Sequence, residues 1–182
     1  IFSGSQAHLL SEMFQSARRA FYQSAHSFPL QQIKQEDYVS WARGLFAAKD
    51  ADLPCEVAKE VVERCEYQPV YIQQFLYRLW QSRNLDISKV ESIEQEIIQS
   101  HRNEYMSVFD SLTANQKKGL KLIARTGGQS MYQADNLSSV GFSTASLLTR
   151  AIDSLLDKEL IAKNGTWQIQ DVMLKKWVLA MC

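Results

Sequence analysis

Residues that bind metals or form disulfides are scarce in this sequence. It holds only three cysteines and three histidines, and neither CxxC nor HxxxH spacing occurs among them. Structural and catalytic metal sites usually draw Cys and His ligands from such close spacings. We therefore expect no bound metal, and we expect reduced thiols in a cytoplasmic protein.

Net charge and long apolar runs are lacking as well. Lys plus Arg and Asp plus Glu both total 20, so the formal net charge is zero, which argues against binding nucleic acid or membranes by bulk electrostatics. The charge is slightly uneven, because residues 1–104 carry 11 basic and 14 acidic side chains and residues 105–182 carry 9 and 6. No run of about 18 apolar residues occurs, so we expect no transmembrane helix and no membrane partner.

The sequence does contain many apolar residues, 46% of the total, and most are spaced for helices. From Gln35 onward this spacing predicts successive helices that begin near Gln35, near Asp52 or Pro54, at Pro69 and at Ser88. We expect the last of these to run without a break over roughly 88–109. Short breaks between such helices predict antiparallel neighbours, and hence a helical bundle over about 35–105.

Aromatic residues follow the helical spacing of this bundle. The inward stripe of the first helix would contain Tyr38, Trp41, Ala42, Leu45 and Phe46. Most of the other aromatic side chains would also face the core, whereas Tyr71 and Tyr77 would be partly outward and available to an interface.

The remaining sequence has a different pattern. A helix capped by Thr113 ends at Gly127-Gly128, a short helix follows, and a third helix begins at a Ser143 cap. Strands over 160–163 and 166–170 flank an Asn164-Gly165 turn, which is the strongest short-range signal for a hairpin. Three helices followed by a hairpin is the order of a winged helix-turn-helix, and a closing helix over 171–182 would pack back on it.

The opening stretch, IFSGSQAHLL, has the pattern of a buried strand end, a tight turn and a helix start. The apolar pair Ile1-Phe2 precedes Ser3-Gly4-Ser5, and a helix is expected over 5–20. A buried strand needs neighbours on both sides, which this sequence does not supply. We therefore expect an additional domain before Ile1.

Five segments occur in an order that resembles a known family. They are IFSGS…HLL…MF, AFYQSA…FPLQQI…EDYVSWA, YQPVYIQQFLYRLW, FDSLTANQKKGLKLIA and GTWQIQDVMLKKWV. Together they resemble the C-terminal half of prokaryotic P-loop ATPases of the archaeal type, within the AAA+ and signal-transduction ATPase group. The resemblance covers nearly all of the sequence, and it implies a nucleotide-binding α/β domain, a helical lid and a winged helix.

The resemblance implies that the first residues end the strand that carries the polar sensor of the γ-phosphate. It places the Walker A loop and the Walker B acid in a preceding P-loop domain, because neither GxxxxGK[ST] nor an apolar strand ending in Asp-Asp or Asp-Glu occurs here. This portion alone would then be unable to hydrolyse ATP and would need no cofactor. ATP and Mg²⁺ would be the cofactors of the intact protein, and the P-loop domain its first partner.

Candidate catalytic residues near the N-terminus also follow from the resemblance. Ser3 or Ser5 would be the sensor, although Ser5 fits a helix N-cap equally well. Arg18 or Arg19 would reach a phosphate as an arginine finger, although arginines at a helix end also interact favourably with the helix dipole.

Candidate nucleotide-binding residues lie at the start of a lid helix, where the family has Gly-His-Pro. This sequence has Tyr67-Gln68-Pro69 there, so only the proline matches. Gln68 and Pro69 would line the nucleotide cleft, or they would simply begin the helix.

Candidate DNA-binding residues lie on the third winged-helix helix, over 143–156, and on the wing. The outward face of that helix would contain Ser146, Thr149, Arg150, Asp153 and Ser154. Base readout favours Arg, Lys, Asn and Gln, so Thr149, Arg150, Lys163 and Asn164 are the DNA-binding candidates. Only Arg150 fits this pattern well, and a protein-interaction module is the alternative.

We therefore predict a mainly α chain in three parts. Residues 1–34 would be the tail of a P-loop α/β domain, 35–106 a helical lid, and 107–182 a winged helix-turn-helix. The predicted function is the C-terminal portion of an ATP-driven switch or ATPase that relays lid closure to the winged helix. The alternative is a stand-alone winged-helix DNA-binding transcriptional regulator with a helical partner-binding domain. A degenerate member without catalysis is a third interpretation, based on the altered Gly-His-Pro position.

Overall fold

The computed structural model describes residues 13–14, 21–22, 24 and 30–181. Contacts divide the chain into a unit of residues 1–33 and a second unit, Lys34–Cys182. The predicted strand end and the helix over 5–20, with Ser3, Ser5, Arg18 and Arg19, lie outside the described residues. The description that follows concerns the second unit.

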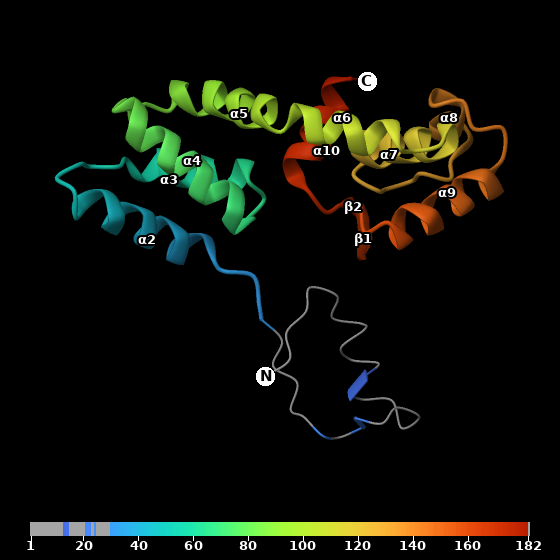
Figure 1. Cartoon of the computed structure of the whole chain (residues 1–182), viewed down its shortest axis with the longest axis horizontal. Coiled ribbons are helices and arrows are strands. Elements are labelled where there is room, and N and C mark those ends of the chain that lie inside the picture. Colours follow the sequence, from blue (N-terminus) through green and yellow to red (C-terminus); the bar gives the residue numbers. More distant parts are fainter. Residues whose placement is uncertain (1–12, 15–20, 23, 25–29, 182) are drawn as a thin grey trace. The chain divides into compact units, whose positions relative to one another are not determined.

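The first part of this unit is a layered set of helices. It consists of α2 (Gln35–Ala47), α3 (Cys55–Arg64), α4 (Pro69–Ser82) and α5 (Ser88–Ser100) (Figure 1). Helix α3 contacts α2, α4 and α5, and α4 also packs on α5. Pro69 occupies the first turn of α4, as predicted, because its missing N–H would have no helical acceptor there.

The helix predicted over 88–109 is in fact two helices. Helix α5 ends at Ser100, α6 (Arg102–Asp110) begins two residues later, and His101 lies between them with φ −96° and ψ 2°. The break turns α6 toward α10 (Val172–Ala180), where the Tyr105 ring lies 5.9 Å from that of Trp177. Apolar periodicity continues through His101, so the sequence pattern did not reveal the change of direction.

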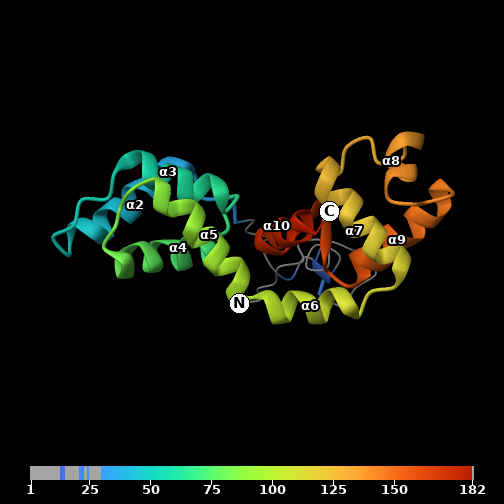
Figure 2. The ribbon, with the colours of Figure 1, turned by 90° about the horizontal axis from the view of Figure 1, so that it is seen from above.

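The second part of the unit is a winged helix. After α6 come α7 (Ala114–Thr126), α8 (Ala134–Ser139) and α9 (Ala145–Asp157), then β1 (Ile161–Asn164), β2 (Thr166–Ile169) and α10 (Figure 2). The strands are antiparallel, with Ile161 opposite Ile169. The predicted fold class, mainly helical with a winged helix and a small hairpin, is confirmed.

The tip of the hairpin differs from the predicted two-residue turn. Asn164 pairs with Thr166, so only Gly165 lies between paired residues. Its φ of +72° is in the left-handed region, which glycine enters without a steric penalty.

Side-chain caps begin two of the winged-helix helices. Thr113 forms a reciprocal capping box with Gln116 at α7, as the sequence predicted in part. Asp171 accepts hydrogen bonds from the amides of Met173 and Leu174 at α10, at 2.8 and 2.9 Å. The Ser143 cap predicted for α9 is wrong, because Thr144 is the N-cap residue and its side chain makes no cap bond.

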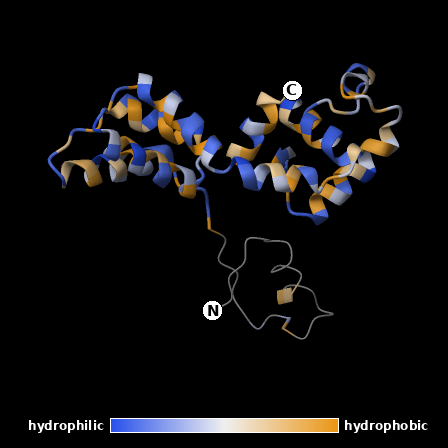
Figure 3. Cartoon of the chain, turned by 45° about the horizontal axis from the view of Figure 1, so that its top comes forward, coloured by the Kyte–Doolittle hydropathy of each residue, from blue (hydrophilic) through white to orange (hydrophobic). Residues whose placement is uncertain are grey.

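The apolar core runs through both parts of the unit, and Figure 3 shows apolar and polar residues alternating along the helices. The inward stripe predicted for α2 is partly wrong, because Trp41 and Leu45 are 43% and 48% exposed. Tyr71, expected to be partly outward, is buried, whereas Tyr77 is exposed as predicted. Within residues 30–181, no helix is long and apolar enough to cross a membrane.

Candidate functional site

Helix α9 presents a polar face to solvent because its apolar face packs on α7. Leu148, Ala151, Ile152 and Leu155 are buried. Gly119 of α7 allows a close approach, since a Cβ at this position would lie 3.4 Å from Ala151 and from Leu155. Thr149 and Arg150, two of the DNA-binding candidates, therefore lie on the exposed face.

The wing carries the other two candidates. Lys163 and Asn164 are exposed at the end of β1. The Lys163 ammonium lies over the indole ring of Trp167, 5.4 Å from its centroid. This cation–π contact holds a positive charge against an aromatic surface.

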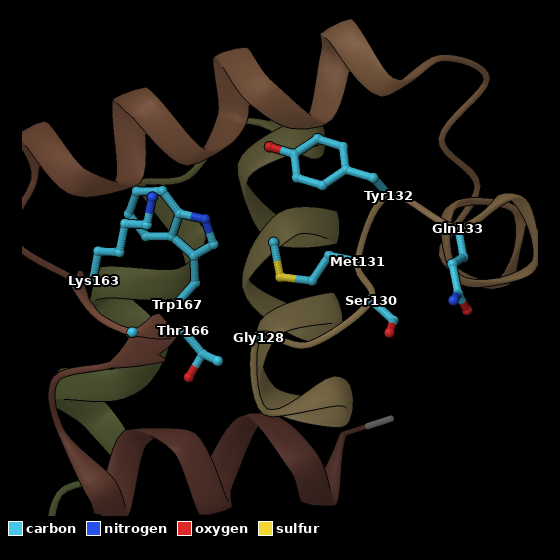
Figure 4. Close-up of a pocket in the computed structure, with 9 residues that line it drawn as sticks. Gly128, Ser130, Met131, Tyr132, Gln133, Lys163, Thr166 and Trp167 are labelled. Carbon is cyan, nitrogen blue, oxygen red and sulfur yellow. The ribbon is translucent and has the colours of Figure 1, made fainter.

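A groove separates the wing from the loop between α7 and α8. It has a volume of about 460 Å³, and its lining includes Gly128, Met131, Tyr132, Gln133, Lys163 and Trp167. Figure 4 shows Lys163 and Trp167 on one side and Tyr132 and Gln133 on the other, with Met131 between them. We call this the wing groove. Its aromatic, cationic and amide groups can bind a planar or anionic partner.

The wing groove reaches the exposed face of α9 through Tyr132. The Thr149 hydroxyl lies 3.5 Å from the Tyr132 hydroxyl. Thr149 and Lys163, predicted separately, therefore border the same surface. Sequence patterns did not indicate Tyr132, Gln133 and Trp167 as site residues, because the loop that carries the first two approaches the wing only through tertiary packing.

A second candidate region joins the first part of the unit to the winged helix, and Gln68 is at its centre. The Gln68 amide donates a hydrogen bond to the carbonyl oxygen of Gln170 at 2.5 Å. Its carbonyl oxygen accepts one from the backbone amide of Val172 at 3.4 Å. The residue before α4 is thus bonded to the residue that follows β2 and to the first residue of α10.

Buried hydroxyl groups continue this junction. The Tyr71 and Tyr105 hydroxyl oxygens lie 3.1 Å apart, and Tyr105 donates to the Asp171 carboxylate at 3.4 Å. Burial is the main cause that raises the pKa of both tyrosines, and the nearby Asp171 carboxylate adds to it. Both phenols therefore keep their protons at neutral pH and act as hydrogen-bond donors.

Ion pairs complete the junction. Lys175 pairs with Glu66, and Lys176 pairs with Glu94. Glu94 is buried and also lies 3.5 Å from the Arg64 guanidinium. We call Gln68, Tyr71, Tyr105, Asp171 and these ion pairs the lid junction.

Cys65 is a buried free thiol at the C-terminal end of α3. Burial raises the pKa of the Cys65 thiol to about 12, so the nucleophilic thiolate is not formed at neutral pH. Within residues 30–181, no group of three or more His, Cys, Asp or Glu side chains is arranged to hold a metal ion.

Comparison with known proteins gives a matching family and a similar solved structure. A family described as a probable winged helix domain matches residues 103–180. Among solved structures, the chain is similar to a Walker-type ATPase of Pyrococcus abyssi, with a TM-score of 0.68, 16% identity and coverage of 96% of this chain and 51% of that one. No curated protein matches.

The likeness to the ATPase shows the fold, and the chain spans about half the length of that protein. The family match and the observed order of helices and strands both place a winged helix in the C-terminal part of the chain. This chain therefore combines a helical region and a winged helix in the fold seen in part of a Walker-type ATPase.

Proposed function

We propose that this chain is the lid and winged-helix portion of an ATP-binding switch protein. A P-loop domain would bind ATP and Mg²⁺, and the helices α2–α5 would close over the nucleotide. The fold likeness to a Walker-type ATPase over 96% of the chain supports this proposal. The sequence itself has no GxxxxGK[ST] loop, so hydrolysis would depend on groups of the P-loop domain.

The observation that carries the proposal is the position of Gln68. By the sequence resemblance, this residue and Pro69 correspond to the Gly-His-Pro that the family has near the nucleotide. In this chain the Gln68 side chain also bonds both Gln170 and Val172 of the winged helix. A movement at the nucleotide end of α4 would therefore be transmitted directly to the base of α10.

The proposed mechanism is a shift between two orientations. ATP would favour one of them only if it binds that orientation more tightly than the other. Ser3 or Ser5 would sense the γ-phosphate, and Arg18 or Arg19 would contact a phosphate. Gln68 and Pro69 would line the nucleotide cleft. A change of orientation there would be transmitted to the lid junction.

The output would be the winged helix, whose exposed face and wing groove can engage a protein or DNA. Sparse positive charge on α9 favours a protein, since Arg150 is its one basic side chain and Asp153 is also exposed there. Phosphate contacts would need more Lys or Arg than this.

The test uses the intact protein encoded by the complete gene. ATP with Mg²⁺ should bind, and hydrogen exchange of the backbone amides between Gln170 and Leu174 should change by about threefold or more, a free-energy difference of about 0.7 kcal/mol. Tyr105→Phe removes the hydroxyl that joins Tyr71 to Asp171, so it should reduce this response without weakening ATP binding. Tyr77→Phe, on the exposed side of α4, is the matched control and should leave the response intact.

Two results would contradict the proposal. The first is an intact protein that has no P-loop and does not bind ATP. The second is ATP binding that leaves the exchange of the Gln170–Leu174 amides unchanged.

The alternative, a stand-alone winged-helix regulator, makes a different prediction. Thr149, Arg150, Lys163 and Asn164 would then contact duplex DNA, and affinity would fall steeply as salt rises. Titration of the chain with duplex DNA at low and high salt tests this. A flat or very weak response would remove the alternative.

A further inference from the structure

A second groove of about 400 Å³ lies along α7 and is strongly basic. Its lining includes Lys117, Lys118, Lys121 and Arg125 of α7, with Phe109 at the end of α6 and Val140 after α8. It shares no lining residue with the wing groove. The four cations lie within nine residues of one helix, a length of about 12 Å between the first and the last.

Most of the charge in this basic groove is not neutralised within the described residues. Lys117 has a carboxylate partner, Asp110, whose oxygen lies 3.7 Å from the ammonium. Lys118 donates instead to the carbonyl oxygen of Gly141 at 2.7 Å. A neutral acceptor orients an ammonium group but leaves its charge, and the ammonium keeps two further N–H donors.

The other two cations are held in the same way. Lys121 donates to the carbonyl oxygen of Met181, and Arg125 donates to the Ser139 hydroxyl, both at 3.4 Å. Across residues 30–181, no carboxylate lies within ion-pair distance of Lys118, Lys121 or Arg125. The basic groove therefore presents at least three positive charges to a partner.

The floor of the basic groove is apolar. The Phe109 ring packs edge-on against Trp177, and the ammonium groups of Lys117 and Lys121 lie 5.1 and 6.0 Å from its centroid. Val140 is half-buried at the opposite side. The groove thus combines a cationic rim with a small hydrophobic floor.

We infer that the basic groove binds an acidic protein segment in which an apolar side chain is flanked by Asp or Glu. Carboxylates would pair with the lysines of the rim, and the apolar side chain would cover Phe109 and Val140. A sugar-phosphate backbone would satisfy the rim but would place no apolar group on the floor. This inference does not depend on the proposed function.

The test measures binding of the 182-residue chain to a fluorescein-labelled synthetic peptide in which Leu and Phe are flanked by Glu and Asp. We expect binding at low salt. The affinity should fall roughly tenfold when the salt concentration is raised until the charges are largely screened. The same peptide with Gln and Asn in place of the acids should not bind measurably.

Variants locate the binding surface. Lys118→Gln combined with Lys121→Gln should weaken peptide binding roughly tenfold, as expected for two lost charge pairs. Arg125→Gln should weaken it less, and it provides a second readout if the double variant proves unstable in circular dichroism. Lys49→Gln combined with Lys158→Gln removes two exposed cations outside the groove and should leave affinity unchanged.

Several outcomes would overturn the inference. They are no binding of the acidic peptide at low salt, equal binding of the Gln and Asn peptide, or equal losses in the groove and control variants. Tighter binding of duplex DNA than of the acidic peptide, lost in the same groove variants, would assign the surface to nucleic acid instead.

Discussion

At the scale of single residues, Gly128 determines how closely the wing approaches α7. Its φ is +74°, and a Cβ at this position would overlap the carbonyl oxygen of Trp167 and lie 2.6 Å from its amide nitrogen. The preceding Gly127 also has a positive φ, +60°, but a Cβ there would meet nothing within 4 Å. Gly128 therefore allows the close approach of the wing, whereas Gly127 ends α7.

Alanine substitutions should separate these two purposes. Gly128→Ala should lower the free energy of unfolding by about 2–4 kcal/mol, because the backbone strain is combined with a clash against another backbone. Gly127→Ala has only the strain and should cost about 1 kcal/mol. Urea unfolding followed by circular dichroism measures both. Equal costs for the two variants would show that the wing does not press on Gly128.

At the scale of helices and strands, local signals at the helix ends were only partly readable. Thr113 lies three residues before Gln116, and this spacing forms a capping box at α7. Ser143 offered a similar signal before α9, but the helix begins one residue later, after Thr144. Where two such residues are adjacent, as Ser143 and Thr144 are, the packing of the helix decides which one is the N-cap. Helix α9 is positioned by its contact with Gly119.

Alanine variants of the two predicted caps should therefore differ. Thr113→Ala removes the hydroxyl that accepts from the Gln116 amide, so it should reduce stability by about 1 kcal/mol. Ser143→Ala removes no cap bond and should change stability by less than about 0.5 kcal/mol. Thermal and urea unfolding of both variants under the same conditions give the comparison. A larger loss for Ser143→Ala would mean that α9 starts where the sequence pattern placed it.

At the scale of the whole molecule, the lid junction links the helical part of the Lys34–Cys182 unit to the winged helix. Its two lysine–glutamate pairs differ in burial. The Glu94 side chain is 10% exposed and has both Lys176 and Arg64 as neighbours, whereas the Glu66 side chain is 49% exposed and pairs with Lys175. A buried charge without a partner lowers stability. The more buried pair, Lys176–Glu94, should therefore control whether the two parts unfold together.

Neutral variants test this difference. Glu94→Gln leaves Lys176 and Arg64 with a weaker partner, so it should lower the free energy of unfolding by about 2–3 kcal/mol, slightly less than for a fully buried pair. Glu66→Gln breaks an exposed pair and should cost less than about 1 kcal/mol. Urea unfolding by circular dichroism, with hydrogen exchange to follow each part, provides the measurement. Similar costs for both variants would contradict a dominant Lys176–Glu94 pair.

Sequence patterns predicted the features that depend on neighbours in the chain. Pro69 marks a helix start, Thr113 and Gln116 form a cap, and Asn164-Gly165 marks a hairpin, because each acts through backbone geometry within a few residues. The exposure of the DNA-binding candidates on α9 was also predictable, because helical spacing separates an apolar from a polar face. The roles of Ser3, Ser5, Arg18 and Arg19 are still predictions, because these residues lie outside the described ranges.

Other features were beyond a local pattern. Trp41 has the spacing of a core residue but is exposed, because no neighbouring element covers that side of α2 within the described residues. The helix breaks at His101 although the apolar period continues through it, because the contacts of Tyr105 with Asp171 and Trp177 are set by tertiary packing. The wing groove and the basic groove each form where separate helices, loops and strands meet.

The sequence by itself determined where most helices and the hairpin form, because the apolar period, proline and glycine act over a few residues. It also determined the mainly helical class and the winged-helix order. Only the tertiary structure decided that Gln68 bonds Gln170 and Val172, more than 100 residues away in sequence, and that the α7 lysines border one groove. Such contacts depend on how whole elements pack, and the packing is set by the summed burial of many side chains rather than by any short motif.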